Sequence, residues 1–415
     1  FLSENMDFVL AVESMAELRG HEIIFMGPSH GTISMVGDKM NARGLARRHD
    51  IPLFESSDVI RNGDIETAAR EAARIGYPVM VKPCSGGGGK GICRAANESE
   101  LSAAAASAAR IGLNLYRDPS FYLERYIRKP VHIEVQIFNG WAIGIRKCAV
   151  QRRNQKIIEE SGHAFLSDYV ALSLLAAAEK IAELSGYSSG GGAGTVEFLI
   201  DTETGKFGFM EMNTRLQVEY AVTDQSLGID IAKWQILFFD GREHEIVGLE
   251  KLKNRVSEND HSIECRIYAE EPENDYLPSP GPIIELDLPT FNGIRCDFGF
   301  MEGDTILPMY DPMIGKLIAH GATRKEAMIR LERALQELYI NGVKTNIPQL
   351  LRIVRHPAFI QGDYTNNLLT EHAELNFIGV ASGPDDSDDR RLLKHVVFGA
   401  FTEHLSDSCC LDALS

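Results

Sequence analysis

Two kinds of hydrophobic pattern alternate along the chain. Apolar residues recur at helical spacing in segments that predict helices, at residues 4–20, 38–50, 65–76, 98–112, 168–186 and 323–338. Alternating or short apolar runs between turn residues predict strands, at residues 21–29, 77–84, 92–97, 131–138, 141–151, 195–201, 206–213 and 261–270. Strand and helix alternate over residues 54–126, which indicates a small α+β unit, whereas strands dominate from residue 131 onward.

The periodic pattern weakens after about residue 373. Residues 381–391 are acidic and rich in glycine, proline and serine, which predicts a linker. Residues 392–405 predict a helix that belongs to a following region.

Composition narrows the classes of function. The 415 residues are 44% hydrophobic, enough for two or three domains, and the net charge of −17 argues against a nucleic-acid-binding protein. No apolar stretch approaches the length of a membrane span, so we expect neither nucleic acid nor membrane as a partner. The seven cysteines contain no C-x-x-C pair, which fits a reducing compartment. We expect a cytoplasmic location, or the mitochondrial matrix if a transit peptide precedes Phe1.

A run of glycines between two predicted strands is the first candidate binding element. Residues 86, 88 and 91 formally match G-x-G-x-x-G, but a strand follows where a dinucleotide site needs a helix. No Gly-Lys-Ser/Thr follows, so the Walker pattern fails as well. Backbone N–H groups of such a loop can approach a polyphosphate closely. A surface hairpin is the alternative, but four consecutive glycines are costly in entropy, which favours a ligand.

The strongest pattern is a predicted hairpin that places Glu197 nearly opposite Glu211, with Asn213 on the same face. Facing carboxylates are destabilising unless something neutralises them. Two carboxylates and an amide oxygen suit Mg²⁺ or Mn²⁺. An exposed acidic face is the alternative, which the apolar neighbours Val196 and Phe198 disfavour.

Charged residues follow and precede this hairpin. If the segment after it is extended, Arg215, Gln217 and Glu219 project to one side, where they could hold and deprotonate a small oxyanion. The run of residues 151–156 is strongly basic, but a solvated strand explains it equally well. His132 alternates with apolar residues, which by itself favours a structural role.

Together these residues resemble a known family. The ordered motifs are H-I-E-V-Q, Q-R-R-x-Q-K, G-T-V-E-F, E-M-N-T-R-L-Q-V-E, E-C-R-I-x-A-E, L-P-S-P-G, Y-D-P-M-I-G-K-L and N-G-V-K-T-N. Over roughly residues 1–373 the chain resembles biotin carboxylase, the first catalytic unit of biotin-dependent carboxylases. The resemblance implies an α+β ATP-grasp fold with a partial N-terminal pre-grasp lobe, a small lid subdomain and a C-terminal biotin carboxylase lobe. It predicts domains at residues 1–53, 54–127, 128–260 and 261–373, with a linker and the start of a following region at 374–415.

The resemblance also implies roles for individual residues. The ATP-binding positions are Lys39, Lys82, Gly88, Gly89, Glu124, Arg125, Ile127, His132, Gln151, Asn154, Glu197 and Glu211. The metal ligands are Glu197, Glu211 and Asn213. The bicarbonate pocket consists of Lys156, Arg215, Gln217, Val218 and Glu219, with Glu219 as the base. Arg266 is the residue that stabilises the biotin enolate, and the catalytic set is Lys156, Arg215, Glu219 and Arg266.

The implied reaction is carboxylation of biotin by ATP and bicarbonate, with Mg²⁺ or Mn²⁺, two ions being expected. The implied partners are a carrier domain that holds biotin, a carboxyltransferase, and a second copy of the chain or a larger assembly. Asn154 and Tyr220 replace histidines that are common in the family, and the family's N-terminal lobe begins earlier, so we expect a fragment. The alternatives are another ATP-grasp ligase, such as a carbamoyl-phosphate synthetase, and a catalytically impaired nucleotide-binding remnant.

Overall fold

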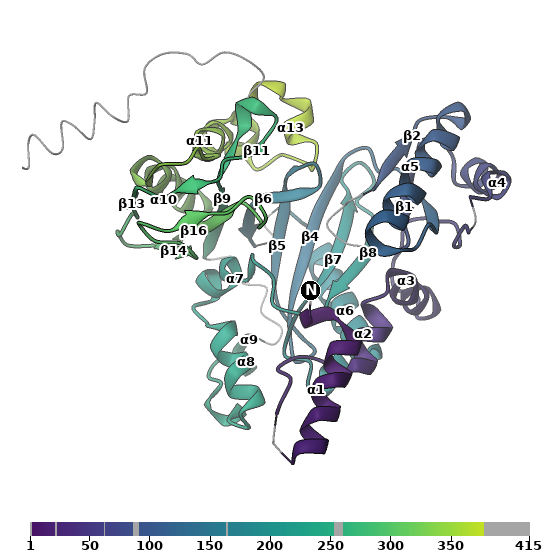
Figure 1. The fold of residues 1–415 in the computed structure, drawn as a ribbon, viewed down its shortest axis with the longest axis horizontal. Helices are drawn as coiled ribbons and strands as arrows, with labels where there is room; N and C mark the ends of the chain where they lie inside the picture. Colours follow the sequence, from purple (N-terminus) through teal and green to yellow (C-terminus); the bar gives the residue numbers. More distant parts are fainter. Residues whose placement is uncertain are drawn as a thin grey trace, which may run out of the picture. The chain divides into compact units, whose positions relative to one another are not determined.

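Eight antiparallel strands form the large sheet of the protein (Figure 1). The computed structural model describes residues 2–20, 23–61, 63–85, 91–162, 165–252 and 260–376. In the sheet the strands follow the order β14-β16-β9-β6-β5-β4-β7-β8. In chain order they are β4 (Pro130–Phe138), β5 (Trp141–Arg152), β6 (Gln155–Ser161), β7 (Ala193–Asp201), β8 (Phe207–Asn213), β9 (His261–Tyr268), β14 (Ile294–Phe298) and β16 (Met313–Gly321).

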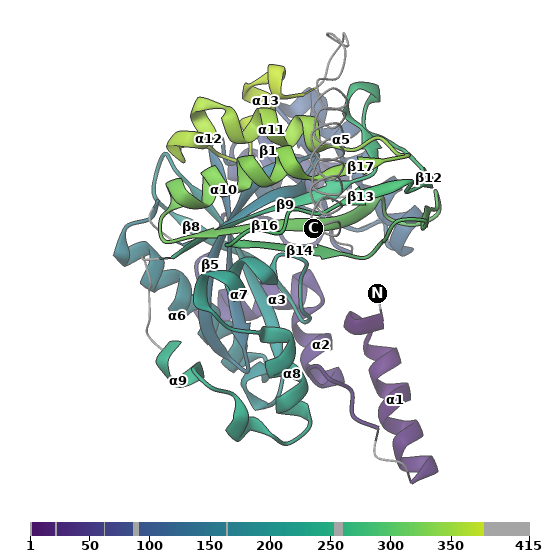
Figure 2. The same cartoon turned by 90° about the vertical axis from the view of Figure 1, so that its left-hand side faces the viewer.

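Helices cover the apolar side of this sheet because its strands alternate. In β4 the side chains of Val131, Ile133 and Val135 belong to the main hydrophobic core, which also contains residues of α6 (Asp168–Leu184). The same core continues into α10 (Arg324–Glu337) and α11 (Ile347–Arg355). Figure 2 shows these two helices over β9 and β16, on the opposite side from α7 (Tyr220–Leu227).

A small three-stranded sheet has a hydrophobic cluster of its own. Its order is β2-β1-β3, from β1 (Val79–Pro83), β2 (Cys93–Ala95) and β3 (Phe121–Arg125). Helices α4 (Ile65–Ile75) and α5 (Glu98–Tyr116) pack on it, and Figure 1 shows this group beside the large sheet. At the start of α5 the N-cap Asn97 side chain accepts from the N–H of Glu100, and the Glu100 carboxylate accepts from the N–H of Ala96, the residue before the N-cap.

The other elements are shorter. Before the small sheet come η1 (Leu2–Glu4), α1 (Met6–Arg19), α2 (His30–Val36) and α3 (Lys39–Arg48). Around the large sheet lie η2 (Tyr187–Ser189), α8 (Ile231–Phe239), η3 (Glu243–Glu245) and α9 (Leu249–Leu252). The C-terminal part adds β10 (Glu270–Glu271), η4 (Pro272–Asn274), β11 (Leu277–Pro278), β12 (Gly281–Pro282), β13 (Glu285–Asp287), β15 (Thr305–Ile306), β17 (Tyr339–Asn341), α12 (Pro357–Gln361), α13 (Leu368–Glu371) and η5 (Ala373–Leu375).

Most predicted elements are confirmed, but the strand at residues 21–29 is wrong for its described part. Residues 23–29 have no regular structure, and the side chains of Ile23, Ile24 and Met26 are exposed. An apolar run forms a strand only where a neighbouring strand satisfies its backbone, and none of the described strands pairs with this segment.

Several other expectations concern the ends and the divisions of the chain. The described residues belong to one compact unit, Phe1–Phe377, and its division into the predicted domains stays a prediction. The linker at 381–391 and the helix at 392–405 lie outside the described residues. Among the described helices, none combines the length and apolar character that a membrane crossing requires.

Candidate active site

The second face of β4 is polar and is nevertheless buried. His132, Glu134 and Gln136 alternate with the core residues of this strand, and Glu134 and Gln136 are completely inaccessible to solvent. Buried polar groups are costly unless they are paired, so this face requires partners from neighbouring strands. Neither Glu134 nor Gln136 was predicted as a site residue, although the alternation H-x-E-x-Q is a sequence signal for both.

The predicted carboxylate hairpin is confirmed. Glu197 on β7 lies in register with Glu211 on β8, and a β-bulge follows Glu197 directly. The amide nitrogen of Asn213 donates to Glu197 Oε1 at 2.9 Å, and Lys39 Nζ lies 2.8 Å from Glu211 Oε2. The structure therefore brings together two facing carboxylates, an amide and a lysine.

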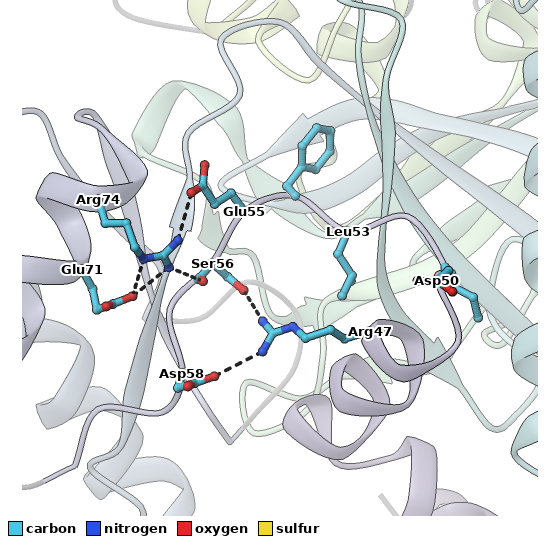
Figure 3. Close-up of a pocket in the computed structure, with 10 residues that line it drawn as sticks. Arg47, Asp50, Leu53, Glu55, Ser56, Asp58, Glu71 and Arg74 are labelled. Atoms are coloured by element: carbon cyan, nitrogen blue, oxygen red, sulfur yellow. Dashed lines mark hydrogen bonds and ion pairs between the residues drawn. The ribbon is translucent and has the colours of Figure 1, made fainter.

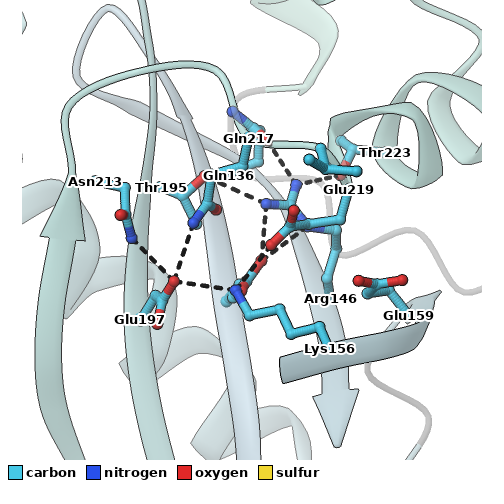
Figure 4. A network of polar contacts seen from close by, with 12 residues as sticks. Gln136, Arg146, Lys156, Glu159, Thr195, Glu197, Asn213, Gln217, Glu219 and Thr223 are labelled. Carbon is cyan, nitrogen blue, oxygen red and sulfur yellow. Dashed lines mark hydrogen bonds and ion pairs between the residues drawn. The ribbon is translucent and has the colours of Figure 1, made fainter. Parts of the chain in front are cut away.

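Lys156 on β6 lies at the centre of the charged network (Figure 4). Its Nζ donates to Glu197 Oε1 at 3.1 Å and to Glu219 Oε1 at 2.8 Å, and it also donates to Glu134. Burial lowers the pKa of Lys156, but the three carboxylates reverse this effect and hold the pKa well above its ordinary value. Lys156 is therefore a permanent cation that joins three strands and the start of α7.

Two further polar side chains lie beside Glu197. Gln217 Nε2 donates to Glu197 Oε1 at 3.0 Å, and His132 Nε2 lies 3.1 Å from Glu197 Oε2. Burial opposes the charged form of His132, but the carboxylates of Glu197 and Glu134 raise its pKa to about 9. His132 thus contacts the carboxylate hairpin directly, and its assignment to the nucleotide site stays a prediction.

Glu219 lies between Lys156 and Arg266. Arg266 on β9 donates to Glu219 Oε2 at 3.0 Å and to Glu159 Oε1 at 2.6 Å. Burial and the neighbouring Glu134 raise the pKa of Glu219, but Lys156 and Arg266 outweigh them, so this pKa lies below its ordinary value. Glu219 is therefore ionised and can accept a proton from a bound molecule.

The fully buried side chain of Arg146 stabilises the charged network. Arg146 donates to Glu134 Oε2 at 3.0 Å, to Gln136 at 2.5 Å and to Thr223 Oγ1 at 2.9 Å (Figure 4). Thr223 is a residue of α7, so this contact ties the helix that follows Glu219 to the sheet. Arg146 was not singled out from the sequence, because a lone arginine in a strand gives no sign that its neighbours are acidic.

A second group of charges lies on the small sheet. Glu124 accepts from Lys82 and from Arg43, whose Nη1 lies 2.7 Å away. Burial raises the pKa of Glu124, but the two cations lower it below its ordinary value. Burial raises the pKa of Tyr122, and the negative charges of Glu124 and, more weakly, Glu211 raise it further.

Of five further predicted residues, three are described and two lie outside the described residues. Arg125 is half-exposed and pairs with Glu55 at 2.6 Å, whereas Ile127 is buried. The Gln151 side chain donates to the main-chain oxygen of Cys148 at 2.8 Å. Gly88 and Gly89 lie outside the described residues.

Asn154 is an exposed residue of the turn between β5 and β6. It follows Arg153, and both residues have positive φ angles, 50° at Arg153 and 65° at Asn154. This left-handed backbone is typical of tight hairpin turns, in which asparagine is well tolerated.

The segment after the hairpin is not extended, so the condition under which its three polar side chains would share one side is not met. Arg215 Nε donates to Glu4 Oε2 at 2.7 Å, whereas Gln217 and Glu219 reach the buried network. The chain turns at Val218 and Glu219 to enter α7, which ends the period-two alternation.

A cavity of about 670 Å³ adjoins Arg125, whose partner Glu55 is one of its lining residues (Figure 3). It is lined by Arg47, Asp50, Ile51, Leu53, Phe54, Glu55, Ser56, Asp58, Glu71 and Arg74. Arg47 pairs with Asp58 at 3.2 Å, and Arg74 pairs with Glu71 at 2.7 Å. Its arginines already have carboxylate partners, and it contains none of the predicted site residues.

Comparison with known proteins identifies the family. Residues 264–371 match the model of the biotin carboxylase C-terminal domain, and residues 38–245 match that of the carbamoyl-phosphate synthase L chain ATP binding domain. Biotin carboxylase 2 of Bacillus subtilis is 38% identical over 377 residues, which cover 89% of this chain and 81% of that protein. The chain belongs to the biotin carboxylase family.

Solved structures of the biotin carboxylase family share the fold. The Campylobacter jejuni biotin carboxylase in its β,γ-ATP complex is 37% identical, with a TM-score of 0.81 over 90% of this chain and 80% of that one. The biotin carboxylase domain of the Hydrogenobacter thermophilus 2-oxoglutarate carboxylase is 36% identical, with a TM-score of 0.82 over 92% of this chain and 82% of that one. That domain was solved as a dimer with MgADP, ADP and bicarbonate. The predicted ATP-grasp fold is confirmed.

Proposed function

We propose that the chain carboxylates biotin with ATP and bicarbonate, as the first half-reaction of a biotin-dependent carboxylase. One observation carries the proposal: the ionised Glu219 lies between Lys156 and Arg266, beside the carboxylate hairpin of Glu197 and Glu211. A buried base next to paired cations suits the binding and deprotonation of a small oxyanion. Relatives of which this chain covers 80% and 81% are named biotin carboxylases, which supports this choice over other ATP-grasp ligases.

ATP is proposed to bind between the small sheet and the carboxylate hairpin. Lys39 and Lys82 would contact its phosphates, and Gly88 and Gly89 are proposed as further ATP-binding positions. Lys39 pairs with Glu211 of the carboxylate hairpin, and Lys82 pairs with Glu124 of the small sheet. Each lysine therefore places its ammonium group at the border between the hairpin and the small sheet. Arg125, Ile127, His132, Gln151 and Asn154 complete the proposed nucleotide contacts.

The carboxylate hairpin fits a divalent cation. Glu197 and Glu211 face each other in register, and Asn213 turns its amide nitrogen to Glu197, so its Oδ1 is left to act as a ligand. Hard oxygen ligands of this kind suit Mg²⁺ or Mn²⁺, and we propose two such ions. When bound, the metal would neutralise charge on the phosphates of ATP.

The proposed chemistry begins at Glu219. Lys156, Arg215, Gln217 and the Val218 main chain hold bicarbonate, and Glu219 removes its proton. The resulting oxygen attacks the γ-phosphorus, the bond to ADP breaks, and carboxyphosphate forms. Lys39 and Lys82 offset the negative charge that develops in this step.

The second stage concerns biotin. Carboxyphosphate breaks into CO₂ and phosphate, and phosphate removes the ureido proton of biotin. Arg266 stabilises the enolate, whose nitrogen then attacks CO₂. Because Arg266 also contacts Glu219, one arginine lies beside both the base and the proposed biotin position.

The proposed partners are a carrier domain that presents biotin, a carboxyltransferase, and a second copy of the chain. Relatives named as subunits of pyruvate and 2-oxoglutarate carboxylases support the first two, and a homologous domain dimer supports the third. A catalytically impaired nucleotide-binding protein is the remaining alternative, favoured by Asn154 at its exposed turn.

The test is ADP formation by the full chain with ATP, Mg²⁺ and free biotin. We expect formation of ADP to depend on bicarbonate and to increase when biotin is added. Glu219→Gln serves as the control, since it preserves shape but removes the base. ATP binding without bicarbonate-dependent turnover would instead support the impaired protein.

A further inference from the structure

The segment that carries Glu219 has little regular structure to hold it. Residues 214–219 leave β8 and reach α7 as a coil and a turn, outside the hydrogen-bond ladder of the sheet. Glu219 is the N-cap of α7, but its side chain makes no capping hydrogen bond because it points to Lys156 and Arg266. The position of this carboxylate therefore depends on contacts from outside the segment.

Lys316 makes two of these contacts, on either side of Glu219. It lies on β16, is 7% exposed, and donates from Nζ to the main-chain oxygen of Val218. The same Nζ lies 4.4 Å from the centre of the Tyr220 ring. One ammonium group thus holds the residue before Glu219 and the residue after it.

The strand pairing places Lys316 next to the arginine that holds the Glu219 side chain. Lys316 and Arg266 are partners in the register of β16 and β9, and Arg266 lies 3.0 Å from Glu219 Oε2. Glu219 is therefore held from two neighbouring positions of the sheet: through its carboxylate by Arg266, and through the preceding carbonyl of Val218 by Lys316.

The surroundings keep the ammonium group at this position. Lys316 Nζ lies 3.6 Å from Glu264 Oε2 and 3.6 Å from Asp297 Oδ2. Both distances exceed an ordinary hydrogen bond, so the Val218 oxygen is the contact that directs the ammonium.

We propose that Lys316 is a positioning residue for the bicarbonate pocket. It fixes the main chain at Val218, and so sets where Gln217 and the base Glu219 lie. This inference rests on the proposed function. It predicts that loss of Lys316 affects bicarbonate far more than ATP, because Lys39 and Lys82 belong to other elements.

The test compares Lys316→Met with Lys147→Met in the full chain. Lys147 on β5 is a matched control, since it is also buried and donates to a main-chain oxygen, that of Gly362, at 2.8 Å. It follows Arg146, so its side chain points to the other face of the sheet. Steady-state ADP formation gives the KM for bicarbonate and for ATP in each variant.

For Lys316→Met we expect the bicarbonate KM to rise about tenfold or more, with the ATP KM within about twofold of the wild type. For Lys147→Met we expect both values to stay within about twofold, even if the melting temperature falls. Equal changes of both KM values in Lys316→Met, or the same pattern in both variants, would overturn the inference.

Lys316→Gln provides a second variant in case the methionine variant does not fold. Its amide nitrogen lies one bond short of the ammonium position and carries no charge, so its contact with the Val218 oxygen is weakened and the same selective rise is expected. An unchanged bicarbonate KM in a folded Lys316→Gln protein contradicts the inference alone. A wild-type chain without bicarbonate-dependent ADP formation contradicts the proposed function as well.

Discussion

Replacing Glu264 with glutamine should remove a source of instability that grows with pH. Glu264 on β9 is fully buried, and neither of its carboxylate oxygens accepts a hydrogen bond from a described residue. Burial raises its pKa from 4.5 to about 8, although Lys316 at 3.6 Å opposes this shift. The folded protein therefore favours the neutral carboxylic acid.

The sign of the effect follows from proton binding. Because the folded state holds this proton more tightly than the unfolded chain, no stability is lost below pH 4.5, and stability falls as pH rises toward about 8. Between about pH 5.5 and about pH 8.5 such a group lowers the free energy of unfolding by roughly 3 kcal/mol. Glutamine keeps the shape of the neutral acid and cannot ionise.

Urea unfolding of wild type and Glu264→Gln at these two pH values measures the effect. We expect the variant to gain roughly 3 kcal/mol relative to wild type on going from the lower to the higher pH. Glu302→Gln, at an exposed position, is the control and should show no such gain. A difference between variant and wild type that is the same at both pH values would refute the reasoning.

Three further predictions concern the charged network. Glu197→Gln and Glu211→Gln should each lower Mg²⁺-dependent phosphate release from ATP by about 100-fold or more. The control Glu203→Gln, in the exposed hairpin turn, should not lower it. Wild-type turnover in Glu197→Gln or in Glu211→Gln contradicts the metal assignment. Arg266→Ala should lower carboxylation of biotin about tenfold more than bicarbonate-dependent ATP cleavage, and equal losses in the two assays argue against its enolate role. Arg146→Met should lower the free energy of unfolding in urea by about 3–5 kcal/mol, because Glu134 is left as a buried charge without this partner; a loss below about 1 kcal/mol would show that the pair is dispensable.

The fold could be predicted where local patterns determine it. The hairpin of β7 and β8 was predicted correctly, with Glu197 opposite Glu211, because turn chemistry and alternation fix the register. The strand at residues 21–29 was wrong because an apolar run does not reveal whether a neighbouring strand exists. The burial of β6 was also missed, since its charged residues are paired with partners distant in sequence.

The site could be predicted only in part from residue patterns. The grouping of Gln217 and Glu219 was expected from an extended segment, yet the structure achieves it through a turn into α7. Glu134 and Arg146 could not be recognised as site residues from the sequence, because their role depends on a 3.0 Å ion pair between two strands. A buried ion pair between strands cannot be predicted from a sequence until the register of the strands is known.

Transfer of labelled carbon from bicarbonate to biotin tests the central claim most directly. The full chain is incubated with ATP, Mg²⁺, biotin and [¹⁴C]bicarbonate, and acid-labile label on biotin is counted together with ADP. The account predicts labelled carboxybiotin in wild type, formed only when ATP is present, and its absence in Glu219→Gln. ADP formation that depends on bicarbonate but leaves biotin unlabelled would contradict the account.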